Sequence, residues 1–83
     1  MEVVLTESAA QDLEALPVPI HARLLRILER LARWPDVSGA RALSGKLAGR
    51  WRMRTGDYRI QFHVEGQRII VERIGHRDRF YDR

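Results

Sequence analysis

The chain has 83 residues, no cysteine and a formal net charge of +4. This length fits one domain over residues 1–83, and the lack of cysteine excludes a disulfide framework and a thiolate metal site. No apolar run approaches the roughly 18 residues of a membrane span, and the start has neither the basic region nor the long apolar core of a signal peptide. We therefore expect a cytoplasmic protein with no membrane partner.

The positive charge is concentrated in the second half of the chain. Residues 1–40 carry four arginines against six carboxylates, whereas residues 41–83 carry eleven basic residues against five carboxylates. Fourteen of the fifteen basic residues are arginine, whose planar guanidinium binds phosphate through two parallel hydrogen bonds. One basic half on a small domain favours a polyanionic partner, although biased codon usage would explain the excess of arginine equally well.

The chain begins with a short β-rich segment over residues 2–6. Thr6 or Ser8 can cap a helix that runs to about Leu16, since a hydroxyl side chain accepts a hydrogen bond from the first helical turn. Apolar residues of this segment share one helical face, which predicts that the helix packs on a core.

A second helix is expected after the break at Pro17-Val18-Pro19, because Pro19 suits a first helical turn. We expect it to end at Pro35. Its apolar residues recur with a period of 3.6, and they are Ile20, Leu24, Ile27, Leu28, Leu31 and Trp34. The first half of the chain therefore predicts a helical hairpin with one apolar stripe to bury.

The segment 36–49 is rich in glycine and is expected to be a connector with a short turn of helix at Arg41-Ala42-Leu43. Alternation with period two then predicts half-buried antiparallel strands over residues 50–54 and 58–64. A tight turn at residues 55–57 joins these two strands.

A third strand is expected over residues 68–74, after a hairpin turn at residues 65–67. Its facing is ambiguous, because Ile69 and Val71 lie in one register whereas Ile70 and Ile74 lie in the other. The predicted fold is α+β with order β-α-α-β-β-β: an N-terminal strand, a helical hairpin, a three-stranded antiparallel meander and a short C-terminal tail. We expect two layers, with the helices on one face of the sheet.

Pairing of these strands would place Arg52, Arg54 and Arg59 on one face of the sheet. His76, Arg77 and Tyr81 would then lie at the edge of that face. Guanidinium groups can bind a phosphate, and an ionisable side chain beside them can donate or accept a proton. This combination suggests RNA as the substrate.

Four segments follow one another in the second half of the chain: Leu43-Ser44-Gly45, Gly49 to Arg54, Gly56 to Ile60 and Gly75 to Asp78. Together they resemble the RelE/ParE superfamily of bacterial type II toxins, and the resemblance spans nearly the whole chain. The resemblance implies a compact sheet with two helices on one face. It also implies an acidic, partly disordered cognate antitoxin as partner. In the RelE branch it implies a metal-independent endoribonuclease without cofactors, which cleaves mRNA in the ribosomal A site.

The resemblance assigns roles to the candidate residues. Arg59 would bind the scissile phosphate, Arg52 and Arg54 would orient the backbone and neutralise charge, and Arg77 would be a second phosphate clamp. Tyr81 would stack on a base or assist proton transfer. We assign acid/base catalysis to His76, because imidazole is the group in this cluster that ordinarily titrates near neutral pH.

Other readings of the same residues remain open. The arginines could form a solvated strand face, His76 could be a loop residue, and Tyr81 could simply pack against the domain. A ParE-like toxin would bind DNA gyrase and have no nuclease activity, and a decayed toxin would only bind its antitoxin and repress their operon.

Overall fold

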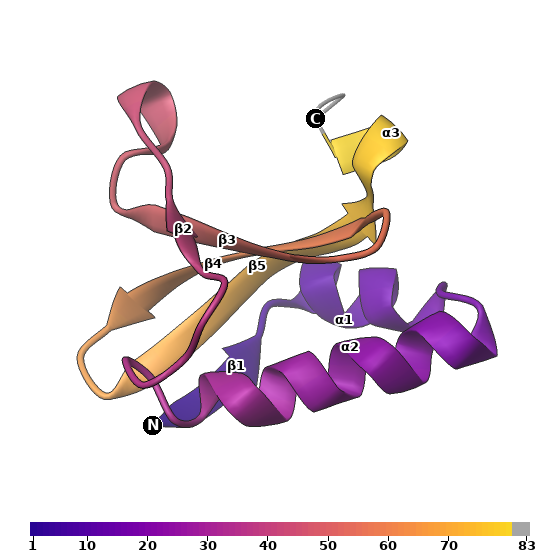
Figure 1. Ribbon diagram of the computed structural model, residues 1–83, viewed down its shortest axis with the longest axis horizontal. Coiled ribbons are helices and arrows are strands. Elements are labelled where there is room, and N and C mark those ends of the chain that lie inside the picture. Colours follow the sequence, from indigo (N-terminus) through magenta and orange to yellow (C-terminus); the bar gives the residue numbers. More distant parts are fainter. Residues whose placement is uncertain (81–83) are drawn as a thin grey trace.

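The computed structural model describes residues 1–80 as a five-stranded mixed sheet with two helices on one face (Figure 1). The sheet order is β1-β5-β4-β3-β2, with β1 parallel to β5 and every other pair antiparallel. The elements are β1 (Glu2–Leu5), α1 (Glu7–Glu14), α2 (Val18–Leu31), β2 (Arg41–Ala42), the 3-10 helix η1 (Gly45–Leu47), β3 (Arg50–Thr55), β4 (Tyr58–Glu65), β5 (Arg68–His76) and α3 (Arg77–Phe80). The predicted α+β class and element order are confirmed. No helix of residues 1–80 is long and apolar enough to cross a membrane.

The helices begin where the sequence predicts. The Thr6 hydroxyl accepts a hydrogen bond from the Ala9 backbone N–H at 3.1 Å and caps α1. Helix α2 starts at Val18 with proline in its first turn, but it ends at Leu31, before the predicted stop at Pro35. Residues 32–35 form turns instead, and they place the Trp34 ring 4.9 Å from that of Trp51.

The apolar stripe of α2 packs against the inner face of the sheet. Leu24, Ile27, Leu28 and Leu31 of the helix are buried. The strands contribute Met53, Ile60, Phe62, Ile69, Val71 and Ile74. Burial of this stripe holds α2 on one face of the sheet. Among residues 1–80, the other face, called the open face below, is covered only at the end of β5, where Phe80 of α3 packs against Arg73.

A β-bulge resolves the ambiguous facing of β5. Gln61 pairs with Arg73 whereas Phe62 pairs with Val71, so that Glu72 is the extra residue of the bulged strand. The bulge restarts the alternation, which lets Ile69, Val71 and Ile74 all face the core. It also leaves Glu72 and Arg73 together on the open face, where Glu72 contacts Arg50.

The predicted helical turn at Arg41-Ala42-Leu43 is wrong. Arg41 and Ala42 form the edge strand β2, which pairs with Arg52 and Trp51 of β3, and the Leu43 N–H donates to Arg50 O at 2.9 Å. The unpaired backbone edge of β3 offers hydrogen bonds that outweigh a weak local helix preference. The short helix forms four residues later, as η1. In Figure 1, η1 and α3 both rise on the side of the sheet opposite α1 and α2.

Candidate functional site

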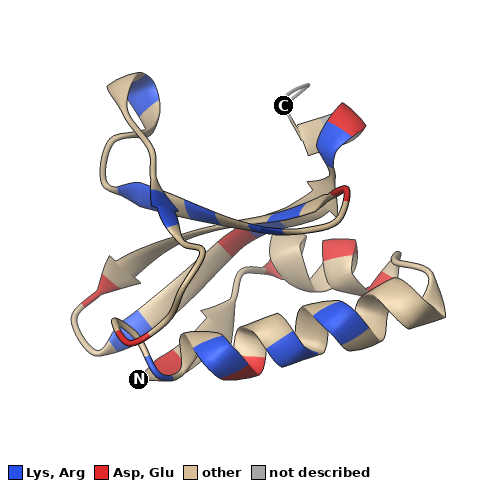
Figure 2. Ribbon diagram, viewed as in Figure 1, with Lys and Arg blue, Asp and Glu red and all other residues tan. Residues whose placement is uncertain are grey.

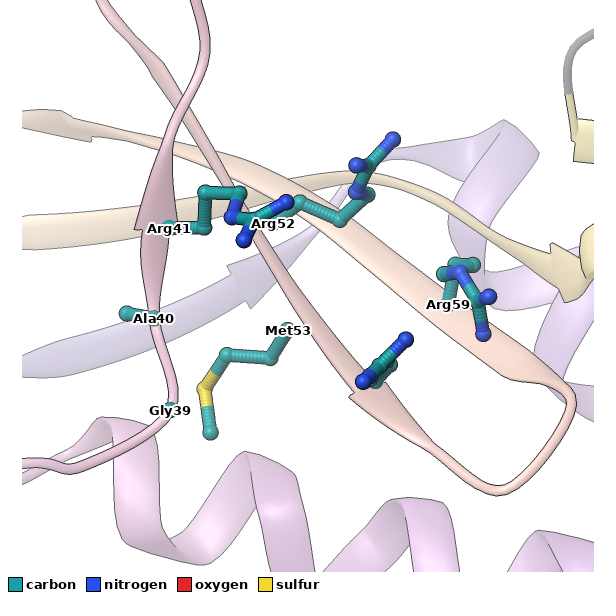
Figure 3. Close-up of a pocket in the computed structure, with 7 residues that line it drawn as sticks. Gly39, Ala40, Arg41, Arg52, Met53 and Arg59 are labelled. Carbon is teal, nitrogen blue, oxygen red and sulfur yellow. The ribbon is translucent and has the colours of Figure 1, made fainter.

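Four arginine side chains surround one hollow on the open face of the sheet. Arg52 and Arg54 project from β3 on the same side, because alternate residues of a strand share a face. Arg41 of β2 pairs with Arg52, and Arg59 of β4 pairs with Arg54. The hollow has a volume of about 500 Å³, and Gly39, Ala40 and Met53 complete its lining. Figure 3 shows the side chains of Arg41, Arg52 and Arg59 along three neighbouring strands, with Met53 directed toward the helix below the sheet.

Arg59 is held over the turn between β3 and β4. Its Nη1 donates to Gly56 O at 3.2 Å and to Tyr58 O at 3.4 Å. Gly56 has φ +56°, a conformation that glycine adopts without the steric cost of a side chain. Carbonyl acceptors orient the guanidinium but do not cancel its charge, so Arg59 remains available to an anion.

The hollow is strongly positive, because the residues of the described range 1–80 that line it include four arginines and no carboxylate. Figure 2 shows that β2 and β3 carry basic residues along their length. The carboxylate of Glu72 lies on the same face, but it accepts from Arg50 Nε at 3.0 and 3.1 Å. Guanidinium groups that face one another across neighbouring strands repel, and an anion between them relieves that repulsion.

Arg77 lies at the end of the sheet beside the turn between β3 and β4, and it does not line the hollow. Its backbone N–H donates to Asp57 O at 2.7 Å. Its Nε lies 3.8 Å from Asp57 Oδ1 and 3.7 Å from Asp78 Oδ1. The side chain is exposed and lies beside these two carboxylates, apart from the arginines that line the hollow.

The structure does not bring His76 together with the arginine hollow. His76 pairs with Tyr58, whose side chain packs against the core, and their rings meet edge to face at 5.2 Å. The two rings line a second hollow with Asp12 and Leu16, on the helix side of the sheet. The backbone N–H of Asp78 donates to His76 Nδ1 at 3.1 Å. The side of the sheet on which His76 lies could not be predicted from the sequence, because the bulge at Glu72 turns every later residue of β5 to the opposite face.

One predicted site residue lies outside the described residues, and one arginine that lines the hollow was not predicted. Tyr81 lies outside residues 1–80, and its role stays a prediction. Arg41 was not predicted as a site residue, because a two-residue edge strand has no periodic signal in the sequence. Within residues 1–80, no group of three or more histidine and carboxylate side chains gathers as a metal site would require.

The sequence is similar to those of known toxins. Residues 3–81 match the family described as the ParE toxin of the type II toxin–antitoxin system parDE. Toxin RelE3 of Methanocaldococcus jannaschii is 31% identical over 85 aligned positions, which cover 99% of this chain and 97% of the relative.

Solved structures share the fold. A chain of the RelBE2 toxin–antitoxin complex of Mycobacterium tuberculosis superposes with a TM-score of 0.81 and 29% identity, and the match covers 92% of this chain and 96% of that chain. A chain of the RelB–RelE complex from Methanococcus jannaschii gives a TM-score of 0.77 and 26% identity, with 95% of each chain covered. The isolated RelE toxin of E. coli has the same fold, with a TM-score of 0.77 at 16% identity.

Proposed function

Since this chain belongs to the RelE/ParE superfamily of type II toxins, we propose that it is a ribosome-dependent endoribonuclease that cuts mRNA in the A site. The observation that supports this function best is the hollow, whose lining within the described part of the chain has four arginines and no carboxylate. A site of this charge suits a substrate whose phosphates gain negative charge during the reaction.

The proposed reaction breaks the RNA strand by attack of a ribose 2′-OH on the adjacent phosphorus. Arg59 binds the scissile phosphate, and Arg52 and Arg54 neutralise charge on its oxygens in the transition state. Arg77, at the edge of the face, holds a neighbouring phosphate. Tyr81 stacks on a base or assists proton transfer.

An antitoxin is part of the same proposal. The relatives from M. tuberculosis and M. jannaschii were crystallised as toxin–antitoxin complexes. We propose an acidic, partly disordered segment that covers Arg52 and Arg59 and folds on binding. The dissociation constant of the toxin–antitoxin complex should rise with salt concentration and with Arg→Ala substitutions at these positions. An affinity that responds to neither change would contradict binding driven by charge.

The test is primer-extension mapping of an mRNA translated in a purified system, with ribosomes present or omitted. The wild-type protein should produce cuts within A-site codons only when ribosomes are present. Arg59→Ala should lower the cleavage rate by about 10²–10³-fold, the typical effect of removing one preorganised donor. Arg26→Ala is the matched control, because it removes an exposed arginine from α2 and should leave cleavage intact. Equal cleavage by Arg59→Ala and the wild type would refute the assigned role.

A ParE-like inhibitor of DNA gyrase is the second candidate. The matched family is described as ParE toxins, and among residues 1–80 those that line the arginine hollow include no side chain suited to proton transfer at neutral pH. A wild-type protein that blocks growth but makes no cuts would favour this function. The arginine hollow would then be a binding surface, and supercoiling by purified gyrase would be the next assay.

A further inference from the structure

Phe80 is a buried aromatic residue on the open face of the sheet, away from the hydrophobic core. It is 3% exposed, although the core cluster lies on the side of the sheet that α2 covers. Its ring contacts the open face of β5 at two positions. The guanidinium carbon of Arg73 stands 4.1 Å from the ring centroid, and a Cβ atom added to Gly75 would lie 3.7 Å from Phe80 Cδ1. Phe80 therefore docks α3 onto the end of β5.

Arg73 contributes to this contact in two ways. Its guanidinium lies over the ring, an arrangement in which the cation is attracted to the negative face of the aromatic system. Its Nη2 also donates a hydrogen bond to the Phe80 carbonyl oxygen. The planar guanidinium can stack and donate at the same time, whereas the ammonium group of a lysine cannot stack. Arg73 thus serves to hold α3, whereas Arg52 and Arg59 line the hollow.

Helix α3 depends on such contacts because it is short. A helix of four residues is too short to be stable in isolation. Its first residue is fixed by the hydrogen bond from the Arg77 N–H to Asp57 O, at 2.7 Å. Its last residue, Phe80, is fixed by Arg73. The two contacts together hold α3 at the end of the open face remote from η1 (Figure 1).

The contact lies beside the residue that is proposed to bind the scissile phosphate. Gly75 is the cross-strand partner of Arg59, and Arg73 is the partner of Gln61. Paired residues of antiparallel strands lie about 5 Å apart and project from the same face. The Phe80 ring, which rests on Gly75, therefore stands next to Arg59 on the β5 side.

We propose that Arg73 is a positioning residue for RNA cleavage, which acts through Phe80 to hold α3 beside the phosphate site, an inference that rests on the proposed nuclease function. Two groups of that function depend on α3. Arg77 is its first residue, and Tyr81, outside the described residues, follows Phe80 directly in the sequence. Displacing a group of an active site by about 1 Å can cost 10²-fold in rate. Arg73 touches no reacting atom, so its loss should slow the cleavage step more than it weakens the binding of RNA.

The experiment measures single-turnover cleavage of ribosome-bound mRNA at increasing protein concentration, below the Tm of every variant. Arg73→Ala and Phe80→Ala should each lower the maximal rate by about 10²-fold, with little change in the protein concentration that gives half of that rate. The double variant should be no slower than either single variant, because residues that act through one contact are not additive. Arg73→Lys keeps a cation over the ring and should be intermediate. Arg68→Ala is the matched control, because it removes an exposed arginine from the same strand, and it should cleave as the wild type does.

Direct contact of Arg73 with RNA would give a different result. The losses of Arg73→Ala and Phe80→Ala would then multiply, and Arg73→Ala would reduce the salt dependence of ribosome binding, as loss of a phosphate contact does. That result overturns the positioning role. An Arg73→Ala rate within about threefold of the wild type, or an Arg73→Lys rate no higher than that of Arg73→Ala, also overturns it, and the nuclease stands in each case. If the wild type makes no cuts, the nuclease function fails and the role of Arg73 fails with it.

Discussion

Replacing Arg54 with glutamine should stabilise the folded protein, although Arg54 belongs to the proposed site. Arg54 is exposed and lies directly across the sheet from Arg59. No carboxylate of residues 1–80 forms an ion pair with it. Like charges at directly opposed strand positions destabilise by about 0.2–1 kcal/mol. For a domain of this size, that range corresponds to a rise in Tm of roughly 1–8 °C.

The assay is thermal and urea unfolding at low salt and at 1 M salt. The gain in stability of Arg54→Gln over the wild type should be smaller at 1 M salt, because the Debye length falls to about 3 Å and the repulsion between the arginines is screened. Arg54→Lys keeps the charge and should match the wild type. Lys46→Gln removes one positive charge from η1, away from the hollow, and controls for the change in net charge. Destabilisation by Arg54→Gln, or a gain equal at both salt concentrations, would refute the idea that the arginines repel one another.

Three further predictions concern the scaffold. Leu24→Ala should cost about 2–5 kcal/mol in urea unfolding, because the side chain is fully buried, and a cost below 1 kcal/mol would contradict the assigned core. Thr6→Ala should cost about 0.5–2 kcal/mol through loss of the α1 cap, whereas Thr6→Ser should retain most of the stability. Gly66→Ala should cost about 1–2 kcal/mol, because φ is +60° and the added methyl meets no neighbour. Gly66→Asn should cost less, and equal effects of the two changes would argue against the left-handed turn.

The sequence predicted the elements that have strong periodicity. The stripe from Ile20 to Leu31 repeats at 3.6 residues over more than two turns, and the structure buries its central members. The alternation around Met53 and Ile60 likewise predicted which face of each strand is buried. In these segments local pattern and tertiary packing favour the same arrangement, which is why the helix layer and the face that bears Arg52, Arg54 and Arg59 could be predicted.

The features that escaped prediction depend on contacts distant in sequence. The two residues of β2 become a strand because β3 has a free edge, and this brings Arg41 into the hollow. The bulge at Glu72 forms because Val71 and Ile74 both gain by burial in the core. That one inserted residue turns His76 to the helix side and brings Glu72 beside His63. Sequence spacing alone counted His76 as a neighbour of the arginines, since it assumes an unbroken strand.

The arginine face links the stability of this protein to its partners. Two cross-strand arginine pairs meet in the hollow, Arg41 with Arg52 and Arg54 with Arg59, and repulsion between Arg54 and Arg59 opposes folding. A ligand that binds only the folded state stabilises it by RT ln(1 + [L]/Kd), about 2.7 kcal/mol at one hundred times Kd. An anion in the hollow also reduces the repulsion between the arginines, and this adds to the stabilisation by binding. RNA phosphates or an acidic protein segment should therefore raise the Tm of the wild type more than that of Arg54→Gln. The charge that makes the free domain less stable is thus the feature that would make it select an anion.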